Sequence, residues 1–174
     1  RRHKIPVWLR FGTYQAVQGD CHAVILHFCQ DGDQITVGDI QLLPYTVPHD
    51  AREPIQYVAS NGLDRLGVLT DAGHATQHLI DALGGCNALV LECNHDLKML
   101  ADSNYPTSLK HRIGGPYGHL SNQTSSEILA ALDRQRLKLV VGAHLSRQNN
   151  TPELAKEALY SAIDPEKISV MIAC

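Results

Sequence analysis

The sequence predicts an α/β protein in which a mixed β-sheet is covered by helices on at least one face. Hydrophobic residues make up 44% and charged residues 19% of the 174 residues, the balance expected of a globular domain with a sizeable core. Strand and hairpin signals fill the first half of the chain, and strands alternate with helices in the second half. No linker, low-complexity tract or repeat of solenoid period interrupts them, so we expect residues 1–174 to form a single domain.

The first half of the chain is predicted to be rich in hairpins. Gly38-Asp39 and Asn61-Gly62 are turn dipeptides, and each lies between two short apolar runs. One short helix is expected after the first strand. The expected strands are residues 5–10, 22–28, 34–37, 40–47, 55–60 and 65–70, and the expected helix is 11–18.

The second half of the chain carries helix start and stop signals. Gly84-Gly85 ends the first helix, while Thr151 and Pro152 provide the N-cap and the first helical residue of the last one. The expected helices are residues 75–83, 95–102, 106–113, 125–135 and 151–163, and the expected strands are 88–92, 138–141 and 168–173.

The composition excludes several classes of protein. No apolar run approaches the ~20 residues of a membrane helix, and the N-terminus lacks a signal-peptide core, so a cytoplasmic location is expected. A net charge of −3 argues against duplex binding by charge alone, so any nucleic-acid contact would be local. The five cysteines include no Cys-x-x-Cys pair, which indicates reduced and mostly buried thiols.

Residues able to bind a metal occur at four informative places. His49, Asp71 and His144 each follow an apolar strand, and His119 precedes a helix. A sheet holds its strand ends rigidly while the following loops face solvent, so ligands placed there can converge on one edge. Imidazole nitrogen and carboxylate oxygen suit zinc, manganese or iron. A carboxylate can also bridge two ions, and such a pair can activate water for a phosphoryl displacement.

Simpler interpretations compete with these. A single strand-end histidine is more often hydrogen-bonded than metal-bound, and Asp71 could be a turn residue. Ser121 and Asn122 precede an expected helix, where backbone N–H groups could hold phosphate or be ordinary caps. The cluster Lys110-His111-Arg112 could contact phosphate, although such clusters are more often solvated. The three strand-end residues taken together favour a metal site.

Five short motifs occur in order along the chain. They are Pro-His-Asp-Ala at 48–51, Thr-Asp-Ala-Gly at 70–73, Glu-Cys-Asn-His-Asp at 92–96, Gly-His-Leu-Ser-Asn at 118–122 and Ala-His-Leu-Ser at 143–146. They resemble the C-terminal motifs of the metallo-β-lactamase superfamily, above all its YycJ/WalJ-like group, which is related to the bacterial phosphoribosyl cyclic phosphodiesterases. The resemblance spans essentially the whole chain. It implies part of an αββα sandwich, that is, mixed sheets flanked by helices.

The resemblance also implies a role for each matching residue. His49 and His144 match histidine metal ligands, and Asp71 matches the carboxylate that bridges two metals. His119 matches a catalytic histidine beside the substrate phosphate or leaving group. His95 lies in a motif typical of the group and is a possible additional site residue. The implied cofactors are two divalent metal ions, zinc or manganese, with iron as a third candidate.

The superfamily motif His-x-His-x-Asp-His is absent from this sequence. We therefore expect a C-terminal portion of a metallo-β-lactamase-fold domain that is inactive alone, with an exposed sheet edge that favours homo-oligomers. The resemblance implies a phosphodiesterase acting on nucleic acid or a small phosphodiester, and more specifically a 5′-to-3′ DNA exonuclease. The alternatives are another ester or thioester hydrolase of the same fold, or a non-catalytic fragment, which the missing motif favours.

Overall fold

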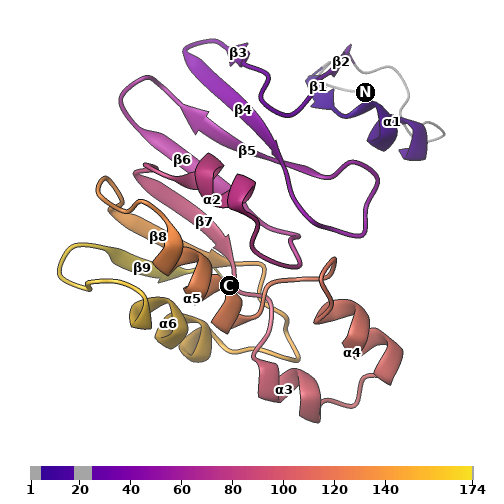
Figure 1. Ribbon diagram of the computed structural model, residues 1–174, viewed down its shortest axis with the longest axis vertical. Coiled ribbons are helices and arrows are strands. Elements are labelled where there is room, and N and C mark those ends of the chain that lie inside the picture. Colours follow the sequence, from indigo (N-terminus) through magenta and orange to yellow (C-terminus); the bar gives the residue numbers. More distant parts are fainter. Residues whose placement is uncertain (1–4, 18–24, 174) are drawn as a thin grey trace.

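The computed structural model describes residues 5–17 and 25–173, and within them the strands form two sheets (Figure 1). The small sheet pairs β1 (Pro6–Leu9) with β2 (Ile25–Phe28) in parallel, and α1 (Phe11–Val17) follows β1 in the chain. The large sheet has seven strands in chain order. They are β3 (Ile35–Val37), β4 (Ile40–Thr46), β5 (Ile55–Ser60), β6 (Arg65–Leu69), β7 (Ala88–Glu92), β8 (Leu139–Ala143) and β9 (Ser169–Ile172).

The large sheet changes from antiparallel to parallel pairing at β6. Strands β3 to β6 form the predicted hairpins, whose turns contain Gly38 and Gly62 at φ values of 60° and 89°. Such φ values strain residues with a side chain and suit glycine. Strands β6 to β9 are parallel and are joined through helices, so their carboxyl ends meet at one edge of the sheet. The mixed α/β fold predicted from the sequence is confirmed.

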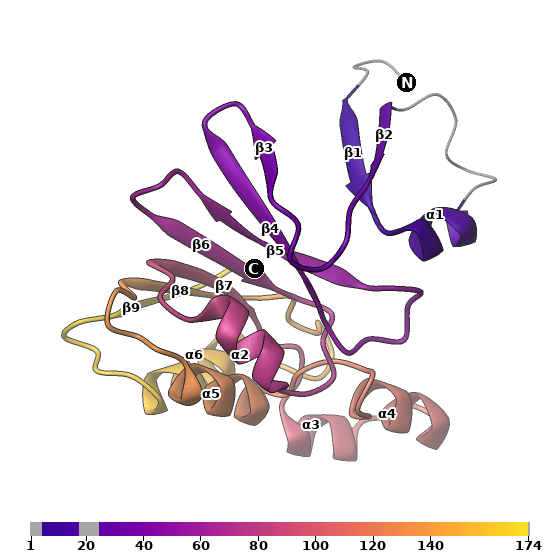
Figure 2. The ribbon, with the colours of Figure 1, turned by 45° about the horizontal axis from the view of Figure 1, so that its top comes forward.

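Helices cover one face of the large sheet (Figure 2). These are α2 (Gln77–Leu83), α5 (Asn122–Ala131) and α6 (Pro152–Ser161), whereas α3 (Leu97–Asp102) and α4 (Thr107–Ile113) follow the end of β7. The core lies between the helices and the sheet. Gly142 of β8 leaves room for Leu159 of α6, because a Cβ at Gly142 would lie 3.0 Å from a Leu159 methyl carbon.

The opposite face of the large sheet is apolar and carries no helix from the described residues (Figure 2). Val68, Val90, Val141 and Met171 lie directly opposite one another across four parallel strands. Side chains alternate between faces along a strand, so this row faces away from the helices. One helix-covered sheet with a second apolar face is the arrangement expected of one half of an αββα sandwich, and β1–β2 is the other sheet present. The single-domain assignment stays a prediction.

Helix boundaries differ from the predicted ones where a cap was misplaced. Helix α5 begins at Asn122 rather than at residue 125, because the Ser121 side chain accepts a hydrogen bond from the Thr124 backbone N–H. It ends by Leu132, short of the predicted residue 135. Similarly, α3 begins at Leu97 because Asp96 is its N-cap, and this leaves His95 in a loop.

The described part of the chain holds three free cysteines, Cys29, Cys86 and Cys93, all buried. This agrees with the expected reduced core thiols. Burial raises the pKa of Cys93 to about 12 despite a hydrogen bond from Ser125. Cys21 and Cys174 lie outside the described residues. None of the described helices is long and apolar enough to span a membrane.

Replacing Leu159 by alanine tests the packing of α6 on the sheet. Leu159 is fully buried, so Leu159→Ala should lower the free energy of unfolding by about 2–5 kcal/mol in urea titrations followed by circular dichroism. Leu63, which is 77% exposed, provides the matched control. Leu63→Ala should change stability by less than about 0.5 kcal/mol. Equal losses in the two variants would contradict the packing described.

Candidate metal centre

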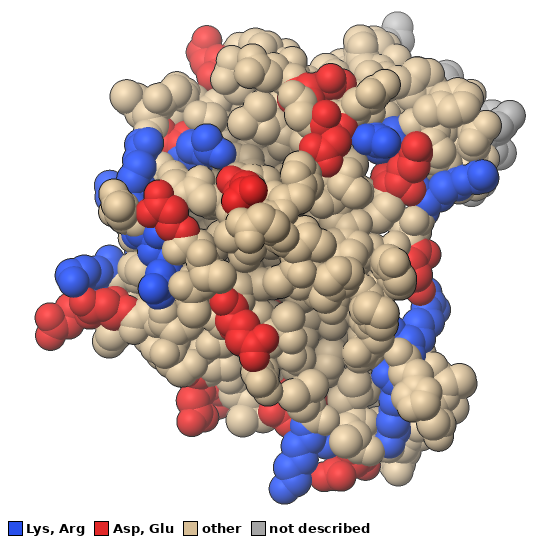
Figure 3. All heavy atoms as spheres, viewed as in Figure 1, with Lys and Arg blue, Asp and Glu red and all other residues tan. Residues whose placement is uncertain are grey.

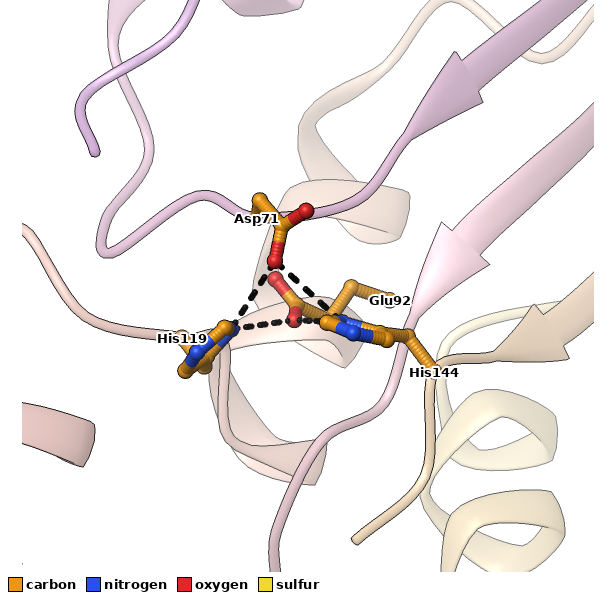
Figure 4. A group of neighbouring side chains, drawn as sticks. All are labelled: Asp71, Glu92, His119 and His144. Carbon is orange, nitrogen blue, oxygen red and sulfur yellow. Dashed lines mark hydrogen bonds and ion pairs between the residues drawn. The ribbon is translucent and has the colours of Figure 1, made fainter. Parts of the chain in front are cut away.

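The parallel strands bring three polar residues to one edge of the sheet. Leu69 of β6 pairs with Leu91 of β7, and Glu92 pairs with Ala143 of β8. Asp71 and His144 therefore follow β6 and β8, and Glu92 is the last residue of β7 between them. Figure 4 shows their side chains meeting there with that of His119, which comes from the loop before α5.

Two of these residues have strained backbones. Asp71 and His144 adopt φ values of 53° and 58°, in the left-handed region that costs a non-glycine residue roughly 1–2 kcal/mol. Such conformations persist only where surrounding contacts hold them, and they concentrate at functional sites. Here the turn after Asp71 points the backbone N–H of Ala72 at Glu92, at 3.1 Å.

Several contacts hold the loop of residues 115–119, which carries His119. A Cβ at Gly118 would lie 2.1 Å from the Arg112 carbonyl oxygen, so only glycine fits at this position. The His119 N–H of this segment donates to the Ile113 oxygen of α4 at 2.8 Å. Nitrogens from other loops also bond to the segment: Asp50 N–H to Tyr117 oxygen at 2.9 Å, His74 Nδ1 to Pro116 oxygen at 2.7 Å and His49 Nδ1 to Gly118 oxygen at 3.0 Å.

The four side chains form a compact donor set. Asp71, Glu92, His119 and His144 each offer one ligand atom, and these atoms lie within 4.8 Å of one another. The Asp71 carboxylate is 3.5 Å from His119 Nδ1 and 3.6 Å from His144 Nδ1. Carboxylate oxygen and imidazole nitrogen are donor types that zinc, manganese and iron bind. The residues present therefore fit a divalent metal.

Glu92 is the most buried member of the set. Its side chain is fully buried, and its Oε1 accepts hydrogen bonds from His119 Nδ1 at 2.9 Å and His144 Nδ1 at 2.7 Å. Its Oε2 accepts from the backbone N–H groups of Ala72 and Leu120, at 3.1 and 3.3 Å. Burial alone would raise the pKa of Glu92, but the hydrogen bonds from the two histidines and Ala72 outweigh it and lower the pKa to about 2. The hydrogen bond to Glu92 in turn raises the pKa of His144.

His49 lies beside the cluster rather than in it. Its ring centroid is 5.2 Å from that of His119, and its Nδ1 contacts the Gly118 carbonyl oxygen. A carbonyl can only accept, so His49 donates from Nδ1 and keeps the Nε2 lone pair. That nitrogen is 3.5 Å from the Asp50 carboxylate. The proposed ligand role of His49 stays a prediction.

His95 is buried away from the cluster. Its side chain is 1% exposed, and neither ring nitrogen has a hydrogen-bond partner among the described residues. Burial lowers the pKa of this imidazole. Its backbone oxygen accepts from the Asn122 N–H, which ties its loop to the start of α5. The role of His95 at the site stays a prediction.

Two phosphate-binding candidates are accounted for by contacts within the protein. Ser121 and Asn122 are buried and the Ser121 hydroxyl caps α5, so the capping interpretation holds. In the basic cluster, Arg112 pairs with Asp50 at 2.6 Å and the Lys110 ammonium donates to the Ala101 carbonyl oxygen at 2.5 Å. Hydrogen bonding to Arg112 lowers the pKa of Asp50.

Sequence reasoning missed Glu92. The residue belongs to the motif at 92–96, in which only His95 was predicted as a possible site residue. A carboxylate that directly ends the apolar run Ala88 to Leu91 was the available signal, because such a position places a charge at the same edge as Asp71 and His144.

Comparison with known proteins agrees with this geometry. No family model matches the chain. Exodeoxyribonuclease YycJ of Bacillus anthracis is 32% identical over 173 residues, covering 98% of this chain and 66% of the relative. The chain thus spans just under two thirds of that protein. Among solved structures, the metallo-β-lactamase-fold protein YhfI of Bacillus subtilis matches with a TM-score of 0.74 at 14% identity, over 98% of this chain and 63% of YhfI. Zn²⁺-bound PqqB of Methylobacterium extorquens matches with a TM-score of 0.66 at 14% identity, over 99% and 64%.

Fold and donor set together place the chain in one class: it is a protein of the metallo-β-lactamase fold. Within that class, the relationship to the YycJ/WalJ-like group that the five motifs predict is confirmed by the similarity over almost the entire chain.

Substituting Gly118 tests whether the His119 loop is held as described. Gly118→Ala would force a methyl group into the Arg112 carbonyl oxygen and should cost about 1–3 kcal/mol of unfolding free energy. Gly114 is a nearby control, since its Cβ would meet its nearest neighbours at 3.5 Å. Gly114→Ala should be neutral or stabilise by about 0.4–1 kcal/mol. Urea unfolding measures both, and a neutral Gly118→Ala would mean that the loop is loose.

Proposed function

We propose that this chain belongs to a metal-dependent phosphodiesterase that acts on DNA, in the specific form of a 5′-to-3′ exonuclease. The observation that carries the proposal is the cluster of Asp71, His119 and His144 around buried Glu92 at the carboxyl ends of parallel strands. The name of the Bacillus anthracis relative supports the substrate class. Nucleic acid or a small phosphodiester is the proposed partner, while homo-oligomer formation and a cytoplasmic location stay predictions.

Asp71, His144 and His49 are the proposed holders of two divalent ions, zinc or manganese. When bound, such ions supply Lewis acidity toward phosphoryl oxygens and water. His119 is the proposed catalytic residue, because its imidazole lies next to the Asp71 carboxylate on a loop fastened at both ends. An imidazole at this place can donate a hydrogen bond or a proton to a phosphate oxygen.

Charge on the surface supports a local contact with nucleic acid rather than a broad one. Figure 3 shows acidic and basic side chains mixed over one face of the molecule. Within α4, Lys110 and Arg112 are engaged by the Ala101 carbonyl oxygen and by Asp50. A short contact near the strand ends therefore fits the net charge of −3 better than a long duplex track.

Two histidine variants of the protein test this function. His144→Ala should lose bound metal in elemental analysis and lose cleavage of end-labelled DNA in Mn²⁺. His119→Ala should keep the metal and lower the cleavage rate by about 10²–10⁴-fold, the usual contribution of a general acid or base. His78→Ala is the control, because His78 is exposed and pairs only with Asp31 among the described residues.

The substrate panel separates this function from its alternatives. Intact DNA, bis-ester and cyclic-phosphate substrates after incubation with metal-loaded protein would rule out the phosphodiesterase. Turnover of carboxylic esters or thioesters without phosphodiester cleavage would instead identify a different hydrolase of the same fold.

A further inference from the structure

Glu92 could act at this site in two ways. It could be a fourth metal ligand, since its oxygen lies within the donor cluster, or it could act through the histidines that it touches. The two roles require different distances and different protonation of the rings, so the structure can distinguish them.

The distances match hydrogen bonds. Two ligand atoms at about 2.1 Å from one tetrahedral ion lie about 3.4 Å apart. The Glu92 oxygen is 2.7 Å from His144 Nδ1 and 2.9 Å from His119 Nδ1, which are charge-assisted hydrogen-bond lengths. The Asp71 oxygen, at 3.5 and 3.6 Å from the same nitrogens, is too far for a good hydrogen bond to either ring, so Glu92 is the acceptor of both Nδ1–H groups.

The second Glu92 oxygen is also engaged. It accepts the backbone N–H groups of Ala72 and Leu120, which belong to the segments that carry Asp71 and His119. A carboxylate that faces four N–H donors has little capacity left for a metal ion. It also connects three of the site's loops at one point.

We propose that Glu92 is a positioning residue, which holds both His119 and His144 in the tautomer with a proton on Nδ1 and leaves their Nε2 lone pairs for metal or substrate. A carboxylate accepts and cannot donate, so each ring must present Nδ1–H to it. In a neutral imidazole the other nitrogen is then the acceptor. The consequence for metal binding rests on the proposed function; the tautomers and ring orientations do not.

Contacts between the surrounding loops fix the positions of Glu92, His119 and His144 relative to one another. The side-chain amides of Asn122 and Asn150 bond to each other in both directions at 2.8 Å, and Asn150 also donates to the Cys93 carbonyl oxygen at 2.7 Å. These three residues follow His119, His144 and Glu92 in the chain. Both amides are buried and each of their polar atoms has a hydrogen-bond partner, so the loops are joined on the side away from the carboxylate.

Long-range ¹⁵N NMR spectra of the metal-stripped protein at pH 9 test the tautomers directly. A neutral imidazole carries a proton on only one ring nitrogen, and the ¹⁵N spectrum shows which one. His119→Asn and His144→Asn spectra assign the signals. The wild-type spectrum should show both rings protonated at Nδ1. A wild-type spectrum with either ring protonated at Nε2 overturns the proposal without any variant of Glu92.

Substitution of Glu92 adds a second test. The backbone N–H groups of Ala72 and Leu120 are fixed donors, so in Glu92→Gln the amide oxygen should turn toward them and the N–H₂ group toward the rings. A ring that faces this N–H₂ group must present a lone pair at Nδ1, so at least one ring should leave the Nδ1–H form. Mn²⁺ affinity measured by calorimetry should fall by about 10–100-fold, as for other supports of metal-binding histidines. Glu92→Asp should restore part of both signals. Glu127→Gln, on the exposed surface of α5, should change neither.

The outcomes separate this proposal from the proposed function. Unchanged tautomers in Glu92→Gln, with one bound ion fewer, would identify Glu92 as a ligand and overturn the positioning role. Rings protonated at Nδ1 in a protein that binds no Mn²⁺ would support the positioning role while contradicting the metal-dependent function.

Discussion

An ionised carboxylate that is fully buried is stable only where enough donors replace the lost water. Glu92 meets this condition with two imidazole and two backbone N–H groups, and its pKa is lowered to about 2 although burial acts in the opposite direction. The donors belong to the loops after β6 and β8 and to the segment before α5. Because each loop must place its N–H at the same point, the carboxylate makes their conformations interdependent.

The same constraint accounts for the strained backbone of the site. Asp71 and His144 take positive φ values immediately after their strands, which turns the Ala72 N–H and the His144 ring toward Glu92. Unfavourable local conformations of this kind are retained when surrounding bonds outweigh their cost. The amide pair of Asn122 and Asn150 adds such bonds on the far side of the same loops.

Sequence patterns predicted the strands well, because hairpin dipeptides and apolar runs are local signals; Gly38 and Gly62 occupy the turns expected of them. The start of α5 was misplaced because Ser121, Ser125 and Ser126 all resemble N-caps, and only the tertiary contacts of the loop select Ser121. At the site, the strand-end rule correctly brought Asp71 and His144 together. The acceptor role of Glu92 depends on strand order and on two imidazoles far away in the chain, which no local pattern encodes.

The mixed sheet explains why His49 is the outlying member of the site. Parallel strands β6 to β8 deliver their carboxyl ends to one edge, whereas His49 follows β4 in the antiparallel part of the sheet. Its link to the cluster is the loop of residues 115–119, through the Gly118 carbonyl oxygen and the contact between the His49 and His119 rings. That loop therefore connects His49 with the residues at the ends of the parallel strands. Because Gly118 has no room for a side chain, backbone packing fixes the position of the loop. The position of the loop in turn sets the distance between His49 and the two histidines that bond to Glu92.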